Sequence, residues 1–350
     1  MKPSSLETVM DAPRSLDPAE TIRCTLSTLP VTPQDVAAAA LRIAPFVHVT
    51  PLLTSRFLSD ACGCDLRLKG EHLQRSGSFK IRGALNRLLT LSDDQKARGV
   101  VAFSSGNHAQ GVALAAQLLG ISATLVMPSD APAVKLAATR GYGASVVLYD
   151  RHSEDREAIA RRLSVEQGRI LVPPFDDPGV IAGQGSIGQE LTAQWPDLDL
   201  ALVPVGGGGL ISGIAIALKA FRPQIRIIGV EPAAADDARQ SLRAGHIVRI
   251  AQPRTVADGV ATQAIGQHTF PIMRALLDDI VTVSEEEIRR AFELVLTRTK
   301  QLVEPTGALT TAAALSGRVP VRGQRVMALL CGGNVDLRAL PQLLPTSPGA

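Results

Sequence analysis

Short apolar runs alternate with helical patterns through the middle of the chain. The runs stand at residues 100–103, 123–127, 145–149 and 169–172. Between them, apolar residues recur every three or four positions, as they do on one face of a helix. Ser153 is expected to cap the third of these helices, because serine accepts hydrogen bonds from a first helical turn. Since parallel strands need helical crossovers, the alternation predicts a small helix-covered parallel sheet over residues 99–175.

A second alternation of the same kind fills the C-terminal half of the chain. Its apolar runs stand at residues 200–205, 226–230, 280–283 and 325–330. A strand pattern at 66–69 and a helical pattern at 79–89 precede the small sheet. We therefore assign residues 31–98 and 176–345 to one large domain. The expected fold class is α/β, with two doubly wound open-sheet domains and a ligand cleft between them.

The first 30 residues differ from the rest of the chain. They are polar, contain prolines and show no clear period, which predicts a flexible N-terminal arm over residues 1–30. Regular structure is expected to begin at Thr32, which can cap a helix that has Pro33 at its first position.

The composition narrows the classes of function. The chain has 350 residues, 45% of them hydrophobic, so it can bury a sizeable core. Its net charge is only +3, and no basic cluster is interleaved with aromatic residues, which argues against nucleic-acid binding. We see neither a signal peptide nor an apolar run of transmembrane length. We therefore expect a cytoplasmic protein without nucleic-acid or membrane partners.

Lys80 stands between a turn of small residues and a helical pattern, in the stretch Ser-Gly-Ser-Phe-Lys-Ile-Arg-Gly-Ala at 76–84. A lysine becomes a nucleophile only when its pKa is lowered or its charge is compensated. Taken alone, Lys80 would therefore be interpreted as one of many solvated lysines. Two other stretches, together with a Gly-Gly-Asn turn at 332–334, change this interpretation.

The first of these stretches is a run of glycines between a strand and a helix: Gly206, Gly207, Gly208 and Gly209. Their N–H groups can close on an anion at the positive end of the helix. The spacing matches neither the dinucleotide fingerprint nor the ATP-binding loop. The run could also be a flexible turn, but its place between a buried strand and a helix favours an anion site.

The second stretch is Ser-Ser-Gly-Asn-His-Ala-Gln-Gly at 104–111, which also follows a strand and opens a helix. Its hydroxyl and amide donors suit a carboxylate, and they are good helix caps as well. One lysine, one phosphate cradle and one carboxylate loop are the parts of an enzyme that uses pyridoxal phosphate (PLP) on an amino acid.

Four motifs, in this order, resemble those of the PLP-dependent serine/threonine dehydratase and serine racemase family, which has the tryptophan synthase β fold. They are the stretches at 76–84 and 104–111, Pro-Val-Gly-Gly-Gly-Gly-Leu-Ile-Ser-Gly at 204–213, and Gly-Gly-Asn-Val-Asp at 332–336. The resemblance covers residues 32–340. It implies that PLP lies in the cleft between the two domains, and that the chain forms a homo-oligomer, a dimer or a tetramer.

The resemblance also implies roles for individual residues. Lys80 would bind PLP covalently and take the proton from the substrate Cα, with Phe79 packed beside the ring. Gly206 to Gly209 would hold the phosphate group, and Asn107 would contact the ring hydroxyl. The substrate carboxylate would be bound by Ser104, Gly106, Asn107 and His108.

Cys331 and Ser105 bear on the type of reaction. By the resemblance, Cys331 would face the pyridine nitrogen. A thiol leaves that nitrogen neutral, which disfavours a long-lived carbanion and favours prompt loss of a β-leaving group. Ser105 would be the acid/base opposite Lys80 in a racemase, but hydroxyaspartate dehydratases of the family carry this serine too. Ser105 therefore leaves both reactions open.

Glu231, Ala235 and Asp237 resemble the family's divalent-cation site. Two carboxylates and a backbone carbonyl are oxygen ligands that suit Mg²⁺, Ca²⁺ or Mn²⁺. Without the resemblance, Glu231 would be interpreted as a strand-end residue and Asp237 as a helix cap.

The expected activity is that of a PLP-dependent ammonia-lyase, a dehydratase that converts a β-hydroxy amino acid to a 2-oxo acid and ammonia. L-Threonine and L-serine are the first candidates as substrates. 3-Hydroxyaspartate, phenylserine and related compounds remain open, as does a serine or aspartate racemase. A β-replacement enzyme and a non-catalytic binding protein fit the motifs less well. The pocket for the substrate side chain is expected around His48 and residues 258–268.

Overall fold

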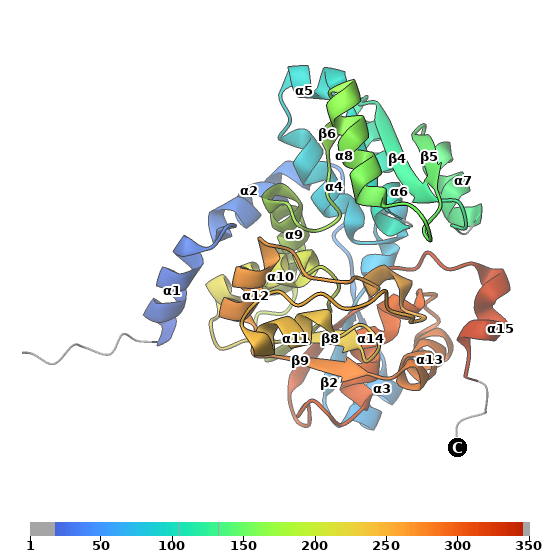
Figure 1. Cartoon of the computed structure of the whole chain (residues 1–350). Coiled ribbons are helices and arrows are strands. Elements are labelled where there is room, and N and C mark those ends of the chain that lie inside the picture. Colours follow the sequence, from blue (N-terminus) through green and yellow to red (C-terminus); the bar gives the residue numbers. More distant parts are fainter. Residues whose placement is uncertain (1–17, 105, 132, 346–350) are drawn as a thin grey trace, which may run out of the picture.

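The computed structural model describes residues 18–104, 106–131 and 133–345. Figure 1 shows two lobes, a smaller one that holds β4, β5 and β6 and a larger one that holds the remaining labelled strands. Each lobe is built on its own sheet. Among the described residues, no helix combines the length and the apolar character that crossing a bilayer requires.

The large sheet has six strands in the order β1-β2-β10-β7-β8-β9. All neighbours pair in parallel except β1, which is antiparallel to β2. The strands are β1 (Leu52–Thr54), β2 (Asp65–Lys69), β7 (Leu200–Pro204), β8 (Arg226–Pro232), β9 (Asp279–Val283) and β10 (Arg325–Leu329). The chain leaves this sheet after β2 and returns to it at β7, so the small sheet is inserted between the two parts.

The small sheet has four parallel strands in the order β5-β4-β3-β6. They are β3 (Val100–Phe103), β4 (Ala123–Pro128), β5 (Ser145–Tyr149) and β6 (Ile170–Leu171). The helices of this lobe are α6 (Asn107–Leu119), α7 (Ala133–Gly141) and α8 (Arg156–Gln167). The predicted α/β class with two open parallel sheets is confirmed. The predicted cap of α8 is wrong, because Asp155 rather than Ser153 accepts the amide hydrogens of Glu157 and Ala158.

Helices cover both faces of the large sheet. They are α2 (Pro33–Ile43), α3 (Arg56–Cys62), α9 (Pro178–Gln194), α10 (Gly209–Phe221), α11 (Asp237–Ala244), α12 (Thr269–Leu276), α13 (Glu285–Leu294), α14 (Pro305–Leu315) and α15 (Leu340–Leu343). Two further helices, α4 (Lys80–Leu89) and α5 (Asp93–Arg98), lie on the side of the smaller lobe (Figure 1), and the apolar residues of α4 share a core cluster with β3, β4 and α6. Short helical turns are η1 (Glu71–Leu73), η2 (Arg75–Gly77), η3 (Asp258–Val260), η4 (Val295–Thr299) and η5 (Leu337–Ala339). Thr32 caps α2, as its place before Pro33 predicts.

The central strands of the large sheet, such as β7, are buried on both faces. Ala201 and Val203 of β7 lie in an apolar cluster with α9, α10 and α12, whereas Leu200 and Leu202 lie in a second cluster with α3, α13 and α14. Successive side chains of a strand point to opposite faces, so one strand contributes to two cores. This explains why its sequence is a continuous apolar run rather than an alternating one.

Part of the predicted flexible arm is a helix instead. Residues 1–17 lie outside the described residues, but Pro18–Thr28 form α1. Leu26 is buried in the same cluster as α10, and Ile22 and Leu29 pack against that cluster. Their spacing of four and three residues is that of one helix face. The surrounding polar residues and prolines concealed this short stripe in the sequence.

Candidate active site

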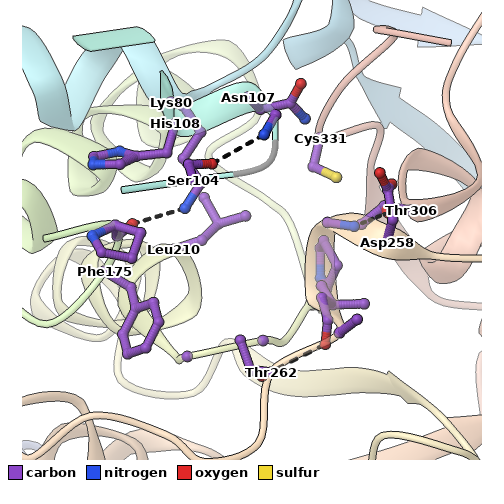
Figure 2. Close-up of a pocket in the computed structure, with 18 of the residues that line it drawn as sticks. Lys80, Ser104, Asn107, His108, Phe175, Leu210, Asp258, Thr262, Thr306 and Cys331 are labelled. Atoms are coloured by element: carbon purple, nitrogen blue, oxygen red, sulfur yellow. Dashed lines mark hydrogen bonds between the residues drawn. The ribbon is translucent and has the colours of Figure 1, made fainter. Parts of the chain in front are cut away.

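A cavity of about 390 Å³ lies between the two lobes, lined by residues of both. It is lined by residues within two positions of the carboxyl ends of β3, β7 and β10, together with the first residue of α4. The carboxyl ends of parallel strands are the usual place for a ligand in an open α/β sheet. Figure 2 shows Lys80, Asn107 and Cys331 around this cavity, with Phe175 and Thr262 on its opposite side.

Lys80 presents its amine to the cavity from the N-terminus of α4. The Nζ atom donates a hydrogen bond to the Pro174 carbonyl at 2.7 Å. Burial lowers the pKa of Lys80 to about 8, because an apolar environment disfavours the ammonium form, although Cys331 and Glu304 act in the opposite direction. A substantial fraction of this amine is therefore neutral near physiological pH, as a nucleophilic lysine requires.

A buried ion network fixes the helical turn that carries Lys80. Arg82 donates to both carboxylate oxygens of Glu71, each at 2.8 Å, and to Glu190 at 2.6 Å. Lys69 donates to the other oxygen of Glu190 at 2.5 Å. The side chains of Arg82, Glu71 and Lys69 are fully buried. Since Arg82 follows Lys80 by two residues, this network ties the lysine-bearing turn to η1 and α9.

The glycine run after β7 is packed too closely for side chains. A Cβ atom at Gly207 would lie 2.3 Å from ring atoms of Phe175, and one at Gly209 would lie 2.7 Å from the Phe175 carbonyl. Gly208 has φ +92°, a left-handed conformation that glycine adopts without strain. Only backbone therefore faces the cavity here, and α10 begins at Gly209. The loop has the construction of an anion cradle at a helix N-terminus.

The polar loop after β3 forms the opposite wall. Ser104 accepts the amide hydrogen of Gly106 at 3.1 Å, and α6 begins at Asn107. The first N–H groups of a helix have no partner within it, so those of Asn107 and His108 are available to an anion. Ser105, the proposed racemase acid/base, lies outside the described residues.

The His108 side chain is directed away from this anion position. Its Nε2 donates to the Val172 carbonyl at 2.9 Å, because a carbonyl can only accept. Burial, and next to it the charge of Lys80, lower the pKa of His108 to about 3. The imidazole is therefore neutral, and a substrate carboxylate would meet the His108 backbone rather than a charged ring.

Cys331 lies two residues beyond the last residue of β10 and is buried. Burial raises the pKa of its thiol well above the usual range, and the nearby Glu304 carboxyl adds to this effect. The side chain is thus a neutral thiol. The Phe79 amide donates to the Cys331 carbonyl at 3.2 Å, which joins the Lys80 turn to the end of β10.

The structure adds charged residues that no sequence motif indicated. Glu304 is buried and accepts a hydrogen bond from Asn107 Nδ2 at 2.5 Å. Lys135 of α7 forms an ion pair with Asp258 of η3 at 2.9 Å. Asp258 does lie in the predicted 258–268 region, and only the Glu-Pro step before α14 could have drawn attention to Glu304. Three arginines that no sequence motif indicated also line the cavity: Arg151, Arg156 and Arg254.

We expected His48 to lie at the pocket for the substrate side chain, and this prediction is wrong. It is not among the residues that line the cavity. Its backbone carbonyl instead accepts hydrogen bonds from Gln74 and Arg82, on the side of the buried ion network. Residues 258–262, in contrast, do line the cavity.

The predicted metal residues lie at the carboxyl end of β8 and the start of α11, outside the cavity lining. Glu231 accepts the amide hydrogens of Ala238 and Arg239, each at 2.9 Å. Both carboxylate oxygens of Asp237 are buried without a hydrogen-bond partner in the described part of the chain. No group of three or more His, Cys, Asp or Glu side chains able to hold a metal occurs among the described residues.

Comparisons with known proteins identify the family to which the chain belongs. Residues 43–332 match the family described as pyridoxal-phosphate dependent enzyme. The chain is 49% identical over 310 residues to L-threo-3-hydroxyaspartate ammonia-lyase of Saccharomyces cerevisiae, which covers 89% of this chain and 95% of the relative. It is 44% identical over 317 residues to the catabolic L-threonine dehydratase TdcB of Escherichia coli strain K12, covering 90% and 96%.

A solved structure of maize serine racemase is similar in fold as well as in sequence. It superposes with a TM-score of 0.86 at 41% identity, covering 89% of this chain and 96% of that chain. The fold and the site thus define an enzyme of the tryptophan synthase β-like type. The chain belongs to the pyridoxal-phosphate-dependent enzyme family, and the resemblance seen in its motifs is confirmed.

Proposed function

We propose that the protein is a PLP-dependent ammonia-lyase that converts a β-hydroxy amino acid to a 2-oxo acid and ammonia. The observation that carries this proposal is the partly neutral amine of Lys80 at the wall of a cavity that also holds a glycine cradle. L-Threonine and L-serine are the first candidate substrates. The relatives named as ammonia-lyase and dehydratase support this reaction class.

The residues present fit PLP. The glycine run offers only backbone, and a Cβ at Gly207 or Gly209 would collide with Phe175, as expected of a cradle shaped for a phosphate group. Lys80 would hold the cofactor covalently, Asn107 would contact its ring hydroxyl and Phe79 would pack beside the ring. Cys331 would face the pyridine nitrogen. When bound, PLP supplies an electron sink for negative charge at the substrate Cα.

Each protein group then has a definable task. The N–H groups at the start of α6, with Ser104 and Gly106, would bind and orient the substrate carboxylate. The neutral amine of Lys80 would accept the Cα proton, for which its lowered pKa is suited. The neutral thiol of Cys331 cannot add a negative charge beside the ring, which favours elimination over reactions that need a long-lived carbanion.

The same site supports 3-hydroxyaspartate as a second candidate substrate. Arg156 lines the cavity, and its guanidinium carbon lies 5.8 Å from the ring centroid of Phe103, the residue before Ser104. An arginine next to the carboxylate loop can bind a second carboxylate in two-pronged geometry. Arg151, in contrast, is already paired with Asp130. A relative named for this substrate supports the same candidate.

A divalent cation at Glu231, Ala235 and Asp237 is a separate part of the proposal. Two neighbouring buried carboxyl groups are costly unless a cation or protons balance them, and burial raises the pKa of Asp237 to about 7. The two oxygens of Asp237 without partners fit an oxygen-liganded ion such as Mg²⁺. An increase in melting temperature on adding Mg²⁺, absent in Asp237→Asn, would support the site.

The decisive experiment is a substrate panel on the purified protein reconstituted with PLP. L-Threonine, L-serine and L-threo-3-hydroxyaspartate would be tested for release of 2-oxo acid and ammonia. Rapid release from one of them is the expected result. Inversion of serine or aspartate without 2-oxo acid would instead identify a racemase. The predicted homo-oligomer, the cytoplasmic location and the exact domain limits stay predictions.

A further inference from the structure

The carboxamide of Asn107 is held at both of its polar atoms. Asn334 Nδ2 donates to the Ser76 carbonyl at 2.7 Å and to Asn107 Oδ1 at 2.9 Å. Because a backbone carbonyl can only accept, the Nδ2 of Asn334 must face Ser76, and the atom of Asn107 beside it must be the oxygen. The Nδ2 of Asn107 is thereby directed to Glu304, 2.5 Å from its Oε1 atom.

This arrangement leaves one donor free on Asn107. A carboxamide nitrogen carries two hydrogens, and Glu304 accepts one of them. Asn107 lines the cavity beside Cys331 (Figure 2), so the second hydrogen is available to a ligand there. The direction of that second N–H bond depends on the first, because the amide group is planar.

Two glycines leave room for this hydrogen-bonded chain. A Cβ atom at position 332 would lie 2.4 Å from Glu304 Oε1 and 3.1 Å from Asn107 Nδ2, too close to Glu304 Oε1 for their hydrogen bond to keep its place. At position 77, a Cβ atom would lie 2.4 Å from Asn334 Oδ1. Gly332 also accepts the Glu304 amide hydrogen at 3.0 Å, which fixes the backbone that carries the carboxyl group.

Glu304 has no evident structural task that would explain its burial. It stands at the N-cap of α14, but its side chain makes no capping hydrogen bond. Its Oε2 atom is buried and has no hydrogen-bond partner among the described residues. A buried carboxyl group that is only partly satisfied costs stability, so a role in the site is a better account of its presence.

We propose that Glu304 is a positioning residue, which orients the Asn107 carboxamide so that its free N–H is presented to the ring oxygen of PLP. This inference rests on the proposed function, in which PLP occupies the cavity. Glu304 would act through Asn107, and the glycine at 332 would be needed because it permits their contact.

A double-mutant cycle tests this inference with cofactor affinity as its readout. Glu304→Met, Asn107→Ala and the double variant would be titrated with PLP, and binding would be followed by visible absorption. We expect each single variant to weaken PLP binding about tenfold, the loss typical of one buried hydrogen bond. The double variant should bind no more weakly than Asn107→Ala, because Glu304 acts only through that residue. Glu304→Gln, which keeps the shape and the acceptor oxygen, should stay within about threefold of the wild type.

Each alternative result has a distinct meaning. Effects that add in the double variant would overturn the proposal, since Glu304 would then act on the cofactor or the fold directly. A Gln variant as weak as the Met variant would overturn it too, because the charge and not the acceptor would matter. If Glu304→Met does not fold, Gly332→Ala takes its place. It should weaken PLP binding when Asn107 is present but have no further effect when it is combined with Asn107→Ala. A wild-type protein that binds no PLP would refute the proposed function instead.

Discussion

Arg82 and Glu71 form an ion pair with two hydrogen bonds of 2.8 Å each, and both side chains are fully buried. Arg82 belongs to the first turn of α4, and Lys80 begins that helix. The pair therefore stabilises the fold and, at the same time, holds the reactive amine in position. Burial lowers the pKa of Arg82, whereas the charge and the hydrogen bonds of Glu71 raise it. The net result is a pKa above the usual arginine value.

The first prediction concerns Arg82→Met. Removing one partner leaves Glu71 buried without its counter-ion, so we expect a loss of about 3–5 kcal/mol in the free energy of unfolding. Denaturant unfolding of both proteins would measure this loss. Arg161→Ala is the matched control, because its pair with Glu157 is on the surface and should contribute no more than about 1 kcal/mol. Equal losses in both variants would contradict the role given to the buried network.

The second prediction concerns Lys80→Ala. Without the amine there is neither a covalent link to PLP nor a base for the Cα proton, so turnover should fall by at least about 10⁴-fold. The visible absorption of lysine-bound PLP should disappear as well. Lys96→Ala, which removes a partly exposed lysine paired with Asp93, should retain both properties. Residual turnover in Lys80→Ala near the wild-type level would exclude Lys80 as the catalytic amine.

The third prediction concerns the pH dependence of PLP attachment. Only the neutral amine of Lys80 reacts, and its pKa is lowered from 10.5 to about 8 by burial. The rate at which the cofactor-free protein takes up PLP covalently should therefore rise with pH and level off above about 8. Absorption-monitored reconstitution over a range of pH would measure the midpoint. A midpoint near 10.5 would show that the amine is solvated.

The lowered pKa of Lys80 also has a consequence for stability. Between pH 8 and 10.5 the unfolded chain binds more protons at this amine than the folded protein does. The buried amine of Lys80 destabilises the folded protein at low pH, and this penalty in the free energy of unfolding should shrink as the pH rises through this window. Comparison of Lys80→Met with the wild type, both free of cofactor, isolates this contribution. A stability difference between them that does not change with pH would contradict the lowered pKa.

Much of the fold follows from the order of apolar runs and helical patterns. The runs at 100–103 and 200–205 became buried strands because parallel sheets need residues that are apolar on both faces. The site was predictable where it depends on the backbone alone, as at Gly207. A run of glycines between a buried strand and a helix indicates an anion-binding loop. Glu304 and Arg156 were not predictable, because their roles depend on contacts between segments far apart in the sequence. Helix α1 was missed because three apolar residues are too few for a reliable period.

The fourth prediction tests the glycine cradle through Gly207→Ala. The added Cβ would lie 2.3 Å from the Phe175 ring, so the loop or the ring must move. Overpacking of this kind costs about 1–3 kcal/mol, and we expect PLP affinity to fall roughly tenfold or more. Gly141→Ala is the matched control, since a Cβ there meets no atom within 4 Å. Equal PLP affinity in the two variants would mean that this loop does not hold the phosphate group.

The fifth prediction distinguishes the two candidate substrates through Arg156→Ala. A β-carboxylate bound by this guanidinium would lose a charge-assisted hydrogen bond of about 1.5–3 kcal/mol, so kcat/KM for 3-hydroxyaspartate should fall roughly ten- to hundredfold. L-Threonine has a methyl group in place of that carboxylate, and its kcat/KM should change by less than about threefold. Arg151→Ala serves as the control, because that side chain is already paired with Asp130.

A loss of the same size for both substrates would mean that Arg156 supports the loop at Ser104 rather than binding the substrate side chain. A loss confined to 3-hydroxyaspartate would identify Arg156 as the residue that selects a dicarboxylic substrate, because only that substrate carries a second charge into this part of the cavity.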